Sequence, residues 1–429
     1  MFRETRDTHQ RESVAVIGSG VSGLTAAYVL ARSHDVTLFE ADHRLGGHAH
    51  THVIDTADGP VCVDSGFIVH NNHNYPNLTR LFDELDVRTQ STEMSMNISC
   101  SSCGLSYSGG RGANGIFSQR RRVADPRFLY KLTEIKRFHR EARQLIASDA
   151  VSPTWREFLA EGEFSDYFVD HFANPLVSCV WSSGEEDTGL YPAKHLFQFL
   201  DNHGMLSVGG SPDWRTVTGG SHKYVNAVAS NLIDAGATIR TSAPITAIVR
   251  RADGVEVRQG ESTARFDRVV VATHADQALK LLADADESER RDLAAIRYSR
   301  DRTVLHSDSS LLPETRTRSG WNHRATCRTG SRRRQAQVSY WMNRLMRLDA
   351  DRDFIVTLNC QSEIDPASVI AEMEYTHPIF THEAVSAAER LRGGGGPRLA
   401  FAGAHLGWGF HEDGCRSGAE AARKFGATW

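Results

Sequence analysis

The sequence lacks the features that mark several large classes of protein. It has seven cysteines in 429 residues, and an odd number without paired spacing argues against a disulfide-stapled secreted scaffold. No uninterrupted apolar stretch reaches about 18 residues, so no transmembrane segment is predicted. The formal net charge is −4, which gives no global electrostatic footprint for nucleic acid. We therefore expect a cytoplasmic protein that binds no nucleic acid.

The few cysteines also bear on metal binding. Cys100 and Cys103 form the only Cys-x-x-Cys pair, and zinc would need two further ligands at a matching spacing. The histidines between residues 48 and 73 are the only source that the spacing suggests. Segments 96–100 and 105–107 have the pattern of strands around a turn. This pattern disfavours a redox-active Cys-x-x-Cys pair, which lies at the start of a helix in thioredoxin-like folds. We expect no metal site.

What the chain does have is a nucleotide-binding fingerprint near its N-terminus. An apolar strand at 14–17 is followed by Gly18-Ser-Gly20-Val-Ser-Gly23, a helical run and a second strand that ends at Glu40. In such a βαβ unit the first glycine permits a tight turn, the second admits a pyrophosphate, and the third lets the helix pack closely. The acid about 20 residues further on binds ribose hydroxyls. The sequence therefore predicts a site for an ADP group.

The residues after Glu40 indicate which nucleotide the site binds. The stretch Ala41-Asp-His-Arg44-Leu-Gly46-Gly47-His48 places an arginine and a glycine pair directly after the ribose-binding acid. This pattern resembles the flavin-containing amine oxidase and phytoene desaturase superfamily. The resemblance implies FAD, with the glycine N–H groups and the arginine against its diphosphate. His48 departs from the arginine or lysine that the family more often has there.

Further motifs extend the resemblance along nearly the whole chain. They are similar to a bacterial family of predicted NAD/FAD-binding proteins within that superfamily, and they lie at 214–221, 305–308, 340–343, 377–378 and 409–414. The resemblance implies an α/β fold with a Rossmann-like FAD-binding domain, of the amine oxidase or glutathione-reductase-2 type, interleaved with an α+β substrate domain. We expect the first domain at 13–74, 214–289 and 397–429, and the second at 75–213 and 290–396. Apolar patterns predict strands at 269–273, 303–306, 337–341, 354–358 and 399–403.

The resemblance also implies which residues meet the cofactor. The chain from Ala402 onward is similar to the superfamily's closing strand, loop and helix, whose positive N-terminal end suits the anion that forms on a reduced flavin. No cysteine lies in the closing loop where a covalent flavin would attach, so we expect noncovalent FAD. Glu412 and Asp413 either bind the ribityl hydroxyls of the flavin or cap the helix, and capping explains them at least as well. The expected cofactor-binding residues are Gly18, Gly20, Val21, Ser22, Gly23, Glu40, Ala41, Arg44, Gly46, Gly47, His48, Ile248, Thr273, Gly403, Gly414 and Ser417.

The candidate catalytic residues come from the closing segment and the substrate domain. They are His405, Trp408, His411 and Tyr340. A histidine could act as the base because its ordinary pKa lies near working pH. Amine oxidases typically have a lysine near the flavin, whereas this chain has none between Lys280 and Lys424, which disfavours an ordinary amine oxidase.

Substrate and partners follow from the resemblance alone. Members of the bacterial family are often encoded beside cyclopropane-fatty-acid-synthase-like methyltransferases, an association that implies work on lipid acyl chains. We expect an FAD-dependent oxidoreductase that transfers hydride between flavin and a hydrophobic substrate. The expected substrate is an unsaturated or methylated fatty acyl chain. We also expect transient contact with a membrane surface and a methyltransferase as partner. Two alternatives stay open, a flavin amine oxidase for a small amine or amino acid, and a non-catalytic flavoprotein partner of a lipid methyltransferase.

Overall fold

The computed structural model describes residues 11–429 except 182–184, 207–211, 326, 328–336 and 361–363. The chain divides into two compact units, each assembled from segments that are distant in sequence. Unit 1 comprises Met1–Gly47, described from residue 11 onward, Tyr224–Ala295 and Ser386–Trp429, and unit 2 comprises His48–Lys223 and Ile296–Val385. Residues 48–74 and 214–223, which the sequence predicts in the FAD-binding domain, lie in unit 2, whereas 290–295 and 386–396 lie in unit 1.

Unit 1 is built on a parallel sheet of five strands in the order β10–β2–β1–β14–β22. These strands are β1 (Ser13–Ile17), β2 (Asp35–Phe39), β10 (Thr238–Arg240), β14 (Arg268–Val271) and β22 (Leu399–Phe401). The inner strands are buried along most of their length, as expected of a parallel sheet that is covered on both faces. The strand order reverses between β1 and β14, and ligands of such sheets bind outside the carboxyl ends of the strands at that point.

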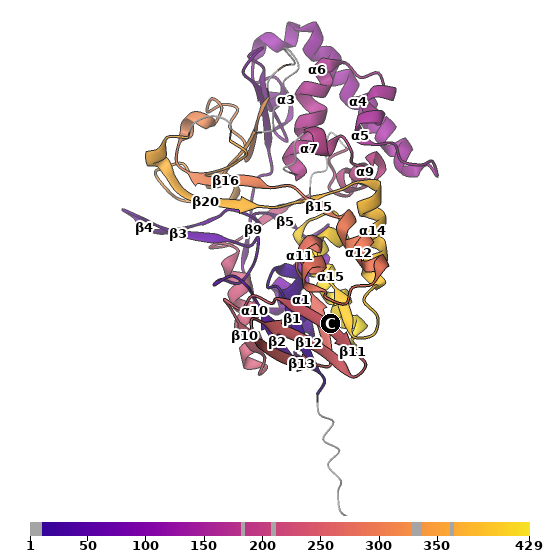
Figure 1. Ribbon diagram of the computed structural model, residues 1–429. Coiled ribbons are helices and arrows are strands. Elements are labelled where there is room, and N and C mark those ends of the chain that lie inside the picture. Colours follow the sequence, from indigo (N-terminus) through magenta and orange to yellow (C-terminus); the bar gives the residue numbers. More distant parts are fainter. Residues whose placement is uncertain (1–10, 182–184, 207–211, 326, 328–336, 361–363) are drawn as a thin grey trace, which may run out of the picture. The chain divides into compact units, whose positions relative to one another are not determined.

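Two helices that begin at this edge pack against each other in unit 1 (Figure 1). Helix α1 (Val21–Leu30) follows β1, and α15 (His411–Lys424) comes after β22. A Cβ on Gly418 would lie 2.2 Å from the carbonyl oxygen of Ser22, so only glycine permits this approach. Other elements in unit 1 or at its boundaries are α10 (His222–Asp234), β11 (Ala247–Arg251), β12 (Gly254–Gln259), β13 (Ser262–Phe266), α11 (Ala275–Leu281), α12 (Glu287–Ala295) and α14 (His382–Gly393).

Unit 2 contains a seven-stranded sheet in the order β20–β16–β19–β18–β17–β7–β8. Its strands are β7 (Met96–Cys100), β8 (Ser106–Gly109), β16 (Asp301–His306), β17 (Trp321–Ala325), β18 (Gln337–Trp341), β19 (Ile355–Leu358) and β20 (Val369–Tyr375). Phe354, Val356 and Tyr340 belong to the apolar core against this sheet. Smaller strands are β3 (Thr51–Thr56), β4 (Gly59–Asp64), β5 (His70–Asn71), β6 (Thr89–Ser91), β9 (Trp214–Val217), β15 (Arg297–Tyr298) and β21 (Pro378–Ile379).

Several helices of unit 2, among them α4 (Pro126–Ala147) and α9 (Ala193–Asn202), pack through a second, aromatic core. Phe138 packs edge-on or tilted against Trp155, Phe168 and Phe197, with ring centroids 5.4–6.0 Å apart. Such contacts favour a fixed arrangement of the helices. The helices are α2 (Pro76–Glu84), α3 (Gly112–Ile116), α4 (Pro126–Ala147), α5 (Trp155–Glu161), α6 (Asp166–Phe168), a π-helical turn (Val169–Ala173), α7 (Asn174–Trp181), α8 (Glu185–Thr188), α9 (Ala193–Asn202) and α13 (Met342–Leu345).

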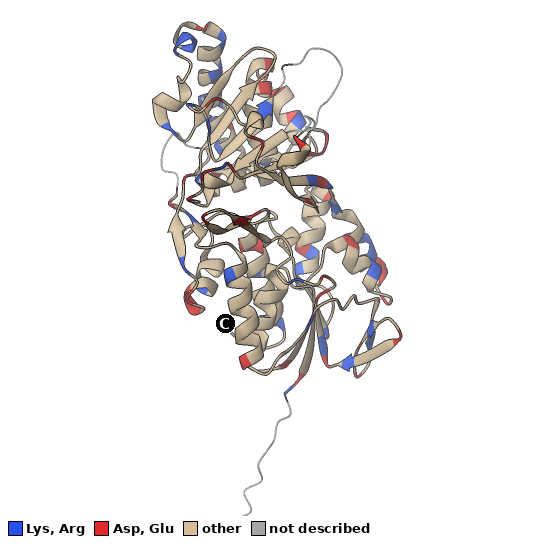
Figure 2. Ribbon diagram, turned by 90° about the vertical axis from the view of Figure 1, so that its left-hand side faces the viewer, with Lys and Arg blue, Asp and Glu red and all other residues tan. Residues whose placement is uncertain are grey.

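Charges of both signs are interspersed along the ribbons of each unit (Figure 2). Helix α4, with 22 residues, buries one face that includes Phe128 and Phe138 and exposes charged residues on the other. Across the described part of the chain, no helix has both the length and the apolar character needed to cross a membrane.

Candidate functional site

The loop between β1 and α1 has the geometry that a pyrophosphate requires. Gly18 has a φ of +99°, and a Cβ on Gly23 would lie 1.9 Å from the Gly18 carbonyl oxygen. The tight turn after β1 and the close packing of α1 against that turn therefore both depend on glycine. Gly20 differs, because within the described part of the chain a Cβ there would meet nothing within 4 Å. Among the same residues, no side chain caps the N-terminus of α1 at Gly20. The uncapped N–H groups and the open side of Gly20 fit an anionic phosphate group.

Glu40 is held at the end of β2 beside this loop. Its Oε2 accepts hydrogen bonds from the amide N–H of Ser19 at 2.8 Å and from the Ser19 hydroxyl at 2.6 Å. Its Oε1 accepts one from the amide of Asp42 at 2.9 Å. A carboxylate offers about four acceptor positions, so the three bonds orient Glu40 and leave capacity for a ribose hydroxyl.

The glycine pair of the next turn lies against the same loop. Gly46 and Gly47 have φ values of +110° and +57°, and the amide of Gly46 donates to the Ser19 carbonyl at 3.0 Å. A Cβ on Gly47 would lie 3.1 Å from the Cα of Gly20. Arg44 donates to the Gly47 carbonyl at 2.8 Å, so the guanidinium stabilises the turn, and its contact with a diphosphate stays a prediction. Ala41 is exposed beside it.

Two further predicted contacts come from the other strands of unit 1. Thr273 follows β14 at the switch point, where its Cγ2 would lie 3.4 Å from a Cβ on Gly18. Ile248, in β11, is fully buried, and its carbonyl accepts a hydrogen bond from the amide of Ala283 at 3.1 Å. The structure therefore places Thr273 beside the glycine loop, and the adenine contact of Ile248 stays a prediction.

The predicted contacts in the closing segment also serve packing inside unit 1. The Ser417 hydroxyl accepts from the amide of Gly403 at 2.9 Å and donates to the Gly414 carbonyl at 2.9 Å. A Cβ on Gly414 would lie 2.5 Å from Val21 Cγ1 and 3.0 Å from the Ser22 hydroxyl oxygen. These residues join the turn after β22, the start of α15 and the start of α1, so both helix N-termini lie at one edge of the sheet.

Asp413 caps α15, as one of the two interpretations of the sequence has it. Its Oδ2 accepts from the amide of Phe410 at 3.1 Å, and its Oδ1 pairs with Arg416 at 3.0 Å. Burial raises the pKa of Asp413 above the ordinary value for an aspartate. The carboxyl is directed at groups of its own helix, which is what a cap requires.

The candidate catalytic residues of unit 1 differ in their surroundings. His405 is buried in the short turn Ala404–Leu406, and burial, followed by the charge of His274, lowers its pKa to about 3. His405 therefore lacks the near-neutral pKa on which its predicted role as a base depends, and its ring is neutral at working pH. His411 is half-buried at the start of α15, with Nε2 3.3 Å from the Tyr224 hydroxyl. Trp408 is half-buried in the loop before it.

Two predicted site residues belong to unit 2. Tyr340 lies in β18, in the apolar core, with its ring 5.6 Å from that of Trp321 in an edge-to-face contact. The ring of His48 lies 5.0 Å from Tyr375 and 5.8 Å from His377. Packing within unit 2 explains the position of Tyr340, and the roles proposed for Tyr340 and His48 stay predictions.

Sequence reasoning missed a buried carboxyl in unit 2. Asp64 accepts hydrogen bonds from the Ser221 amide at 2.9 and 3.0 Å, the Ser221 hydroxyl at 2.8 Å and the Thr51 hydroxyl at 2.5 Å. Burial outweighs these donors and raises the pKa of Asp64 to about 6. The Asp-x-Gly and Gly-Gly-Ser motifs that meet here are visible in the sequence, but their contact is not.

Comparison with known proteins identifies the family. Residues 21–301 match the family described as flavin containing amine oxidoreductase. The chain belongs to this family. Tryptophan 2-monooxygenase from Allorhizobium ampelinum is 46% identical to it over 59 residues, which are 13% of this chain and 8% of that protein. Matches of this kind thus span only a small part of the curated relatives' length.

Solved structures share the fold of this flavin amine oxidoreductase. Cyclohexylamine oxidase from Brevibacterium oxydans superposes with a TM-score of 0.69 over 97% of this chain and 98% of that one, at 18% sequence identity. A CLA-producing fatty acid isomerase from P. acnes gives a TM-score of 0.68 over 96% and 98%, at 17% identity. At such identities the likeness concerns the fold alone.

The family and the geometry of unit 1 agree on the cofactor. Flavin amine oxidoreductases are FAD-dependent oxidoreductases, and this chain belongs to that family. The open side of Gly20, the uncapped start of α1 and the carboxylate of Glu40 suit the ADP half of FAD. The α15 N-terminus at the same edge suits an anionic flavin ring. The residues fit FAD that is bound without a covalent link.

Proposed function

We propose that this flavin amine oxidoreductase dehydrogenates a hydrophobic acyl chain, either unsaturated or methylated. The observation that carries the proposal concerns two buried groups of the closing segment: His405 is neutral, and the Asp413 carboxyl bonds to the Phe410 amide and pairs with Arg416. A neutral acyl chain needs no countercharge there, whereas an ammonium group would be stabilised by a nearby carboxylate. The shared fold of a fatty acid isomerase supports this choice.

The reaction removes a hydride from one carbon and a proton from its neighbour, which leaves a new double bond. FAD, when bound, supplies the hydride acceptor. We assign the uptake of the proton to His411 in the closing segment, whose Nε2 lies 3.3 Å from the Tyr224 hydroxyl, a group that would give the proton a second carrier. The half-buried Trp408 and the buried, neutral His405 would help to keep water from the reacting atoms. A double bond next to the reacting carbon makes the C–H bond easier to break.

Amine oxidation is the second candidate. The family and the fold shared with cyclohexylamine oxidase favour it. The lysines count against it, since the sequence has six and none lies between Lys280 and Lys424. Lys424 donates to the carbonyls of Gly394 and Leu399, and Lys280 is exposed beside Asp276. These contacts give neither lysine the role of positioning water for oxygen.

Anaerobic mixing separates the candidates. The purified FAD protein is mixed with an unsaturated fatty acid, its saturated counterpart, a primary amine and NADPH in separate experiments, and the flavin absorbance is followed. We expect bleaching by the unsaturated acyl chain and none by the saturated chain or the amine. Bleaching by the amine alone would contradict the proposal, and so would bleaching by NADPH alone. A flavin that none of them reduces would point to a non-catalytic partner, for example of a lipid methyltransferase.

The proton-transfer step has its own test. His411→Gln removes the base but keeps a polar group of similar length, and we expect flavin reduction to slow by about 100-fold or more. Tyr224→Phe removes only the hydroxyl and should slow reduction less. FAD content is the control, because neither change alters the glycine loop. An unchanged rate in His411→Gln would contradict the role of His411.

A further inference from the structure

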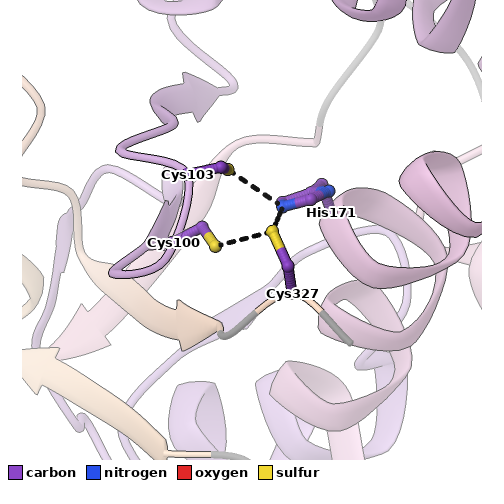
Figure 3. A group of neighbouring side chains, drawn as sticks. All are labelled: Cys100, Cys103, His171 and Cys327. Atoms are coloured by element: carbon purple, nitrogen blue, oxygen red, sulfur yellow. Dashed lines mark hydrogen bonds between the residues drawn. The ribbon is translucent and has the colours of Figure 1, made fainter. Parts of the chain in front are cut away.

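Three cysteines and a histidine converge in unit 2 (Figure 3). The sulfurs of Cys100, Cys103 and Cys327 and the Nε2 of His171 all lie within 4.8 Å of one another. Cys100 Sγ is 3.4 Å from Cys327 Sγ, and His171 Nε2 is 3.4 Å from Cys327 Sγ and 3.5 Å from Cys103 Sγ. Tetrahedral zinc, with bonds of about 2.3 Å to sulfur and 2.0 Å to nitrogen, places its ligands roughly 3.5–3.8 Å apart.

We propose that Cys100, Cys103, His171 and Cys327 bind a structural zinc ion. Four protein ligands fill a tetrahedral shell, which is the arrangement of structural rather than catalytic zinc sites. Thiolate and imidazole ligands select zinc over magnesium and calcium, which prefer oxygen. On binding, each thiol releases its proton to solvent and its sulfur donates an electron pair to the ion.

Local structure aims the three sulfurs at one point. Cys100 ends β7, and the turn to β8 closes with a hydrogen bond from the Gly104 amide to the Cys100 carbonyl at 3.0 Å. Gly104 has a φ of +65°, which glycine adopts readily. Strand β17 runs parallel to β7 with Ala325 opposite Cys100, so Cys327, two residues further on, is delivered beside the turn. The pairing register of the sheet thus supplies the third sulfur.

His171 is oriented as zinc-binding histidines are. It lies in the π-helical turn Val169–Ala173, a distortion that often occurs at functional sites. Its Nδ1 is 2.9 Å from the Tyr167 carbonyl, which can only accept, so Nδ1 carries the hydrogen and Nε2 presents its lone pair to the sulfurs. The Tyr107 hydroxyl donates to the His171 carbonyl at 2.6 Å and fixes the backbone as well.

A buried lysine interacts electrostatically with one of the four residues. Three thiolates, a neutral imidazole and a divalent ion carry one net negative charge. Lys131 is fully buried, and its Nζ lies 3.5 Å from the centre of the Tyr107 ring. Burial lowers the pKa of Lys131 well below the ordinary value for a lysine, and the charge of Cys103 acts in the opposite direction. Among the described residues its Nζ has no hydrogen-bond partner. The negative charge of a zinc–thiolate centre would therefore favour the protonated form of Lys131.

The ion would join parts of unit 2 that are distant in sequence. Cys103 and His171 are 68 residues apart, and Cys100 and Cys327 are 227 apart. Cross-links that close long loops restrict the unfolded chain. The expectation of no metal site rested on a search for partners among residues 48–73. The fold instead supplies two ligands from other segments, so that expectation is replaced by this proposal.

Metal content provides the test. Zinc is measured by mass spectrometry in wild type, Cys103→Ser and Cys62→Ser, each purified without chelator, and FAD absorbance is recorded on the same samples. We expect about one zinc per chain in wild type and in Cys62→Ser, whose half-buried sulfur lies in β4, and less than a tenth in Cys103→Ser. Cys103 is exposed, so its substitution should leave the fold and the FAD intact.

A spectroscopic readout tests the ligand set without turnover. Cobalt(II) exchanged for zinc should give the intense visible bands of a tetrahedral thiolate complex in wild type and lose them in Cys103→Ser. Wild type that stays free of zinc after incubation with Zn²⁺, or equal zinc in wild type and Cys103→Ser, would overturn the proposal. A disulfide among Cys100, Cys103 and Cys327 would do the same and assign the thiols to redox chemistry. None of these readouts depends on the substrate of the flavin.

Discussion

The two units position functional groups in different ways. In unit 1 the predicted nucleotide site is built largely from one continuous stretch, from Gly18 to Gly47, in which Gly18, Gly23 and Gly47 each have a steric reason. In unit 2 the Cys–His cluster, formed by Cys100, Cys103, His171 and Cys327, needs a hairpin, a helical turn and the end of a third strand. These parts are up to 227 residues apart in the sequence. A site within one βαβ unit can be recognised in the sequence, whereas a site that depends on sheet register can be recognised only in the fold.

The largest effect on stability and on FAD binding is expected from a substitution at Gly23 in unit 1. In Gly23→Ala the new Cβ would lie 1.9 Å from the Gly18 carbonyl oxygen, a backbone atom that cannot move without opening the loop. We expect the free energy of unfolding to fall by about 3 kcal/mol and FAD to be lost. Chemical denaturation and flavin content measure the two effects. Wild-type stability with FAD still bound would show that the loop is not constrained as described.

A pH effect of similar size is expected from Asp64 in unit 2. Its pKa rises from 3.8 to about 6 on folding, so the folded protein binds the proton more tightly and stability declines as pH rises from about 4 to about 6. The shift corresponds to about 3 kcal/mol. Asp64→Asn should flatten the stability profile in this window, with a residual slope from Asp413, whose pKa is also raised. An unchanged profile of unfolding free energy against pH would contradict the assignment.

The smallest effect on stability is expected at Gly20, where the fold leaves room for a methyl group but a bound cofactor would not. In Gly20→Ala the Cβ meets nothing within 4 Å and the backbone φ is an ordinary −62°. Stability should therefore stay within about 0.5 kcal/mol of wild type, while FAD affinity falls roughly 10- to 100-fold. Gly393→Ala is the matched control, since its Cβ also meets nothing. Equal FAD affinity in both variants would mean that Gly20 does not border the phosphates.

Local patterns predicted much of the framework. The strand expected at 337–341 is β18 (Gln337–Trp341), and the segment 96–100 is β7 (Met96–Cys100), because alternation and apolar runs are properties of adjacent residues. Interactions between distant segments were not predictable. The bond between Asp64 and Ser221, the meeting of Cys100 with Cys327 and the low pKa of His405 all depend on burial and register, which arise only when the whole unit folds.

One measurement on three proteins tests the central claim that FAD binds at the glycine loop and zinc binds separately at the Cys–His cluster. FAD and zinc are quantified together in wild type, Gly20→Ala and Cys103→Ser. We expect about one of each per chain in wild type, a lower FAD content alone in Gly20→Ala, and loss of zinc alone in Cys103→Ser. Joint loss of both in either variant, or retention of both in both variants, would contradict the claim.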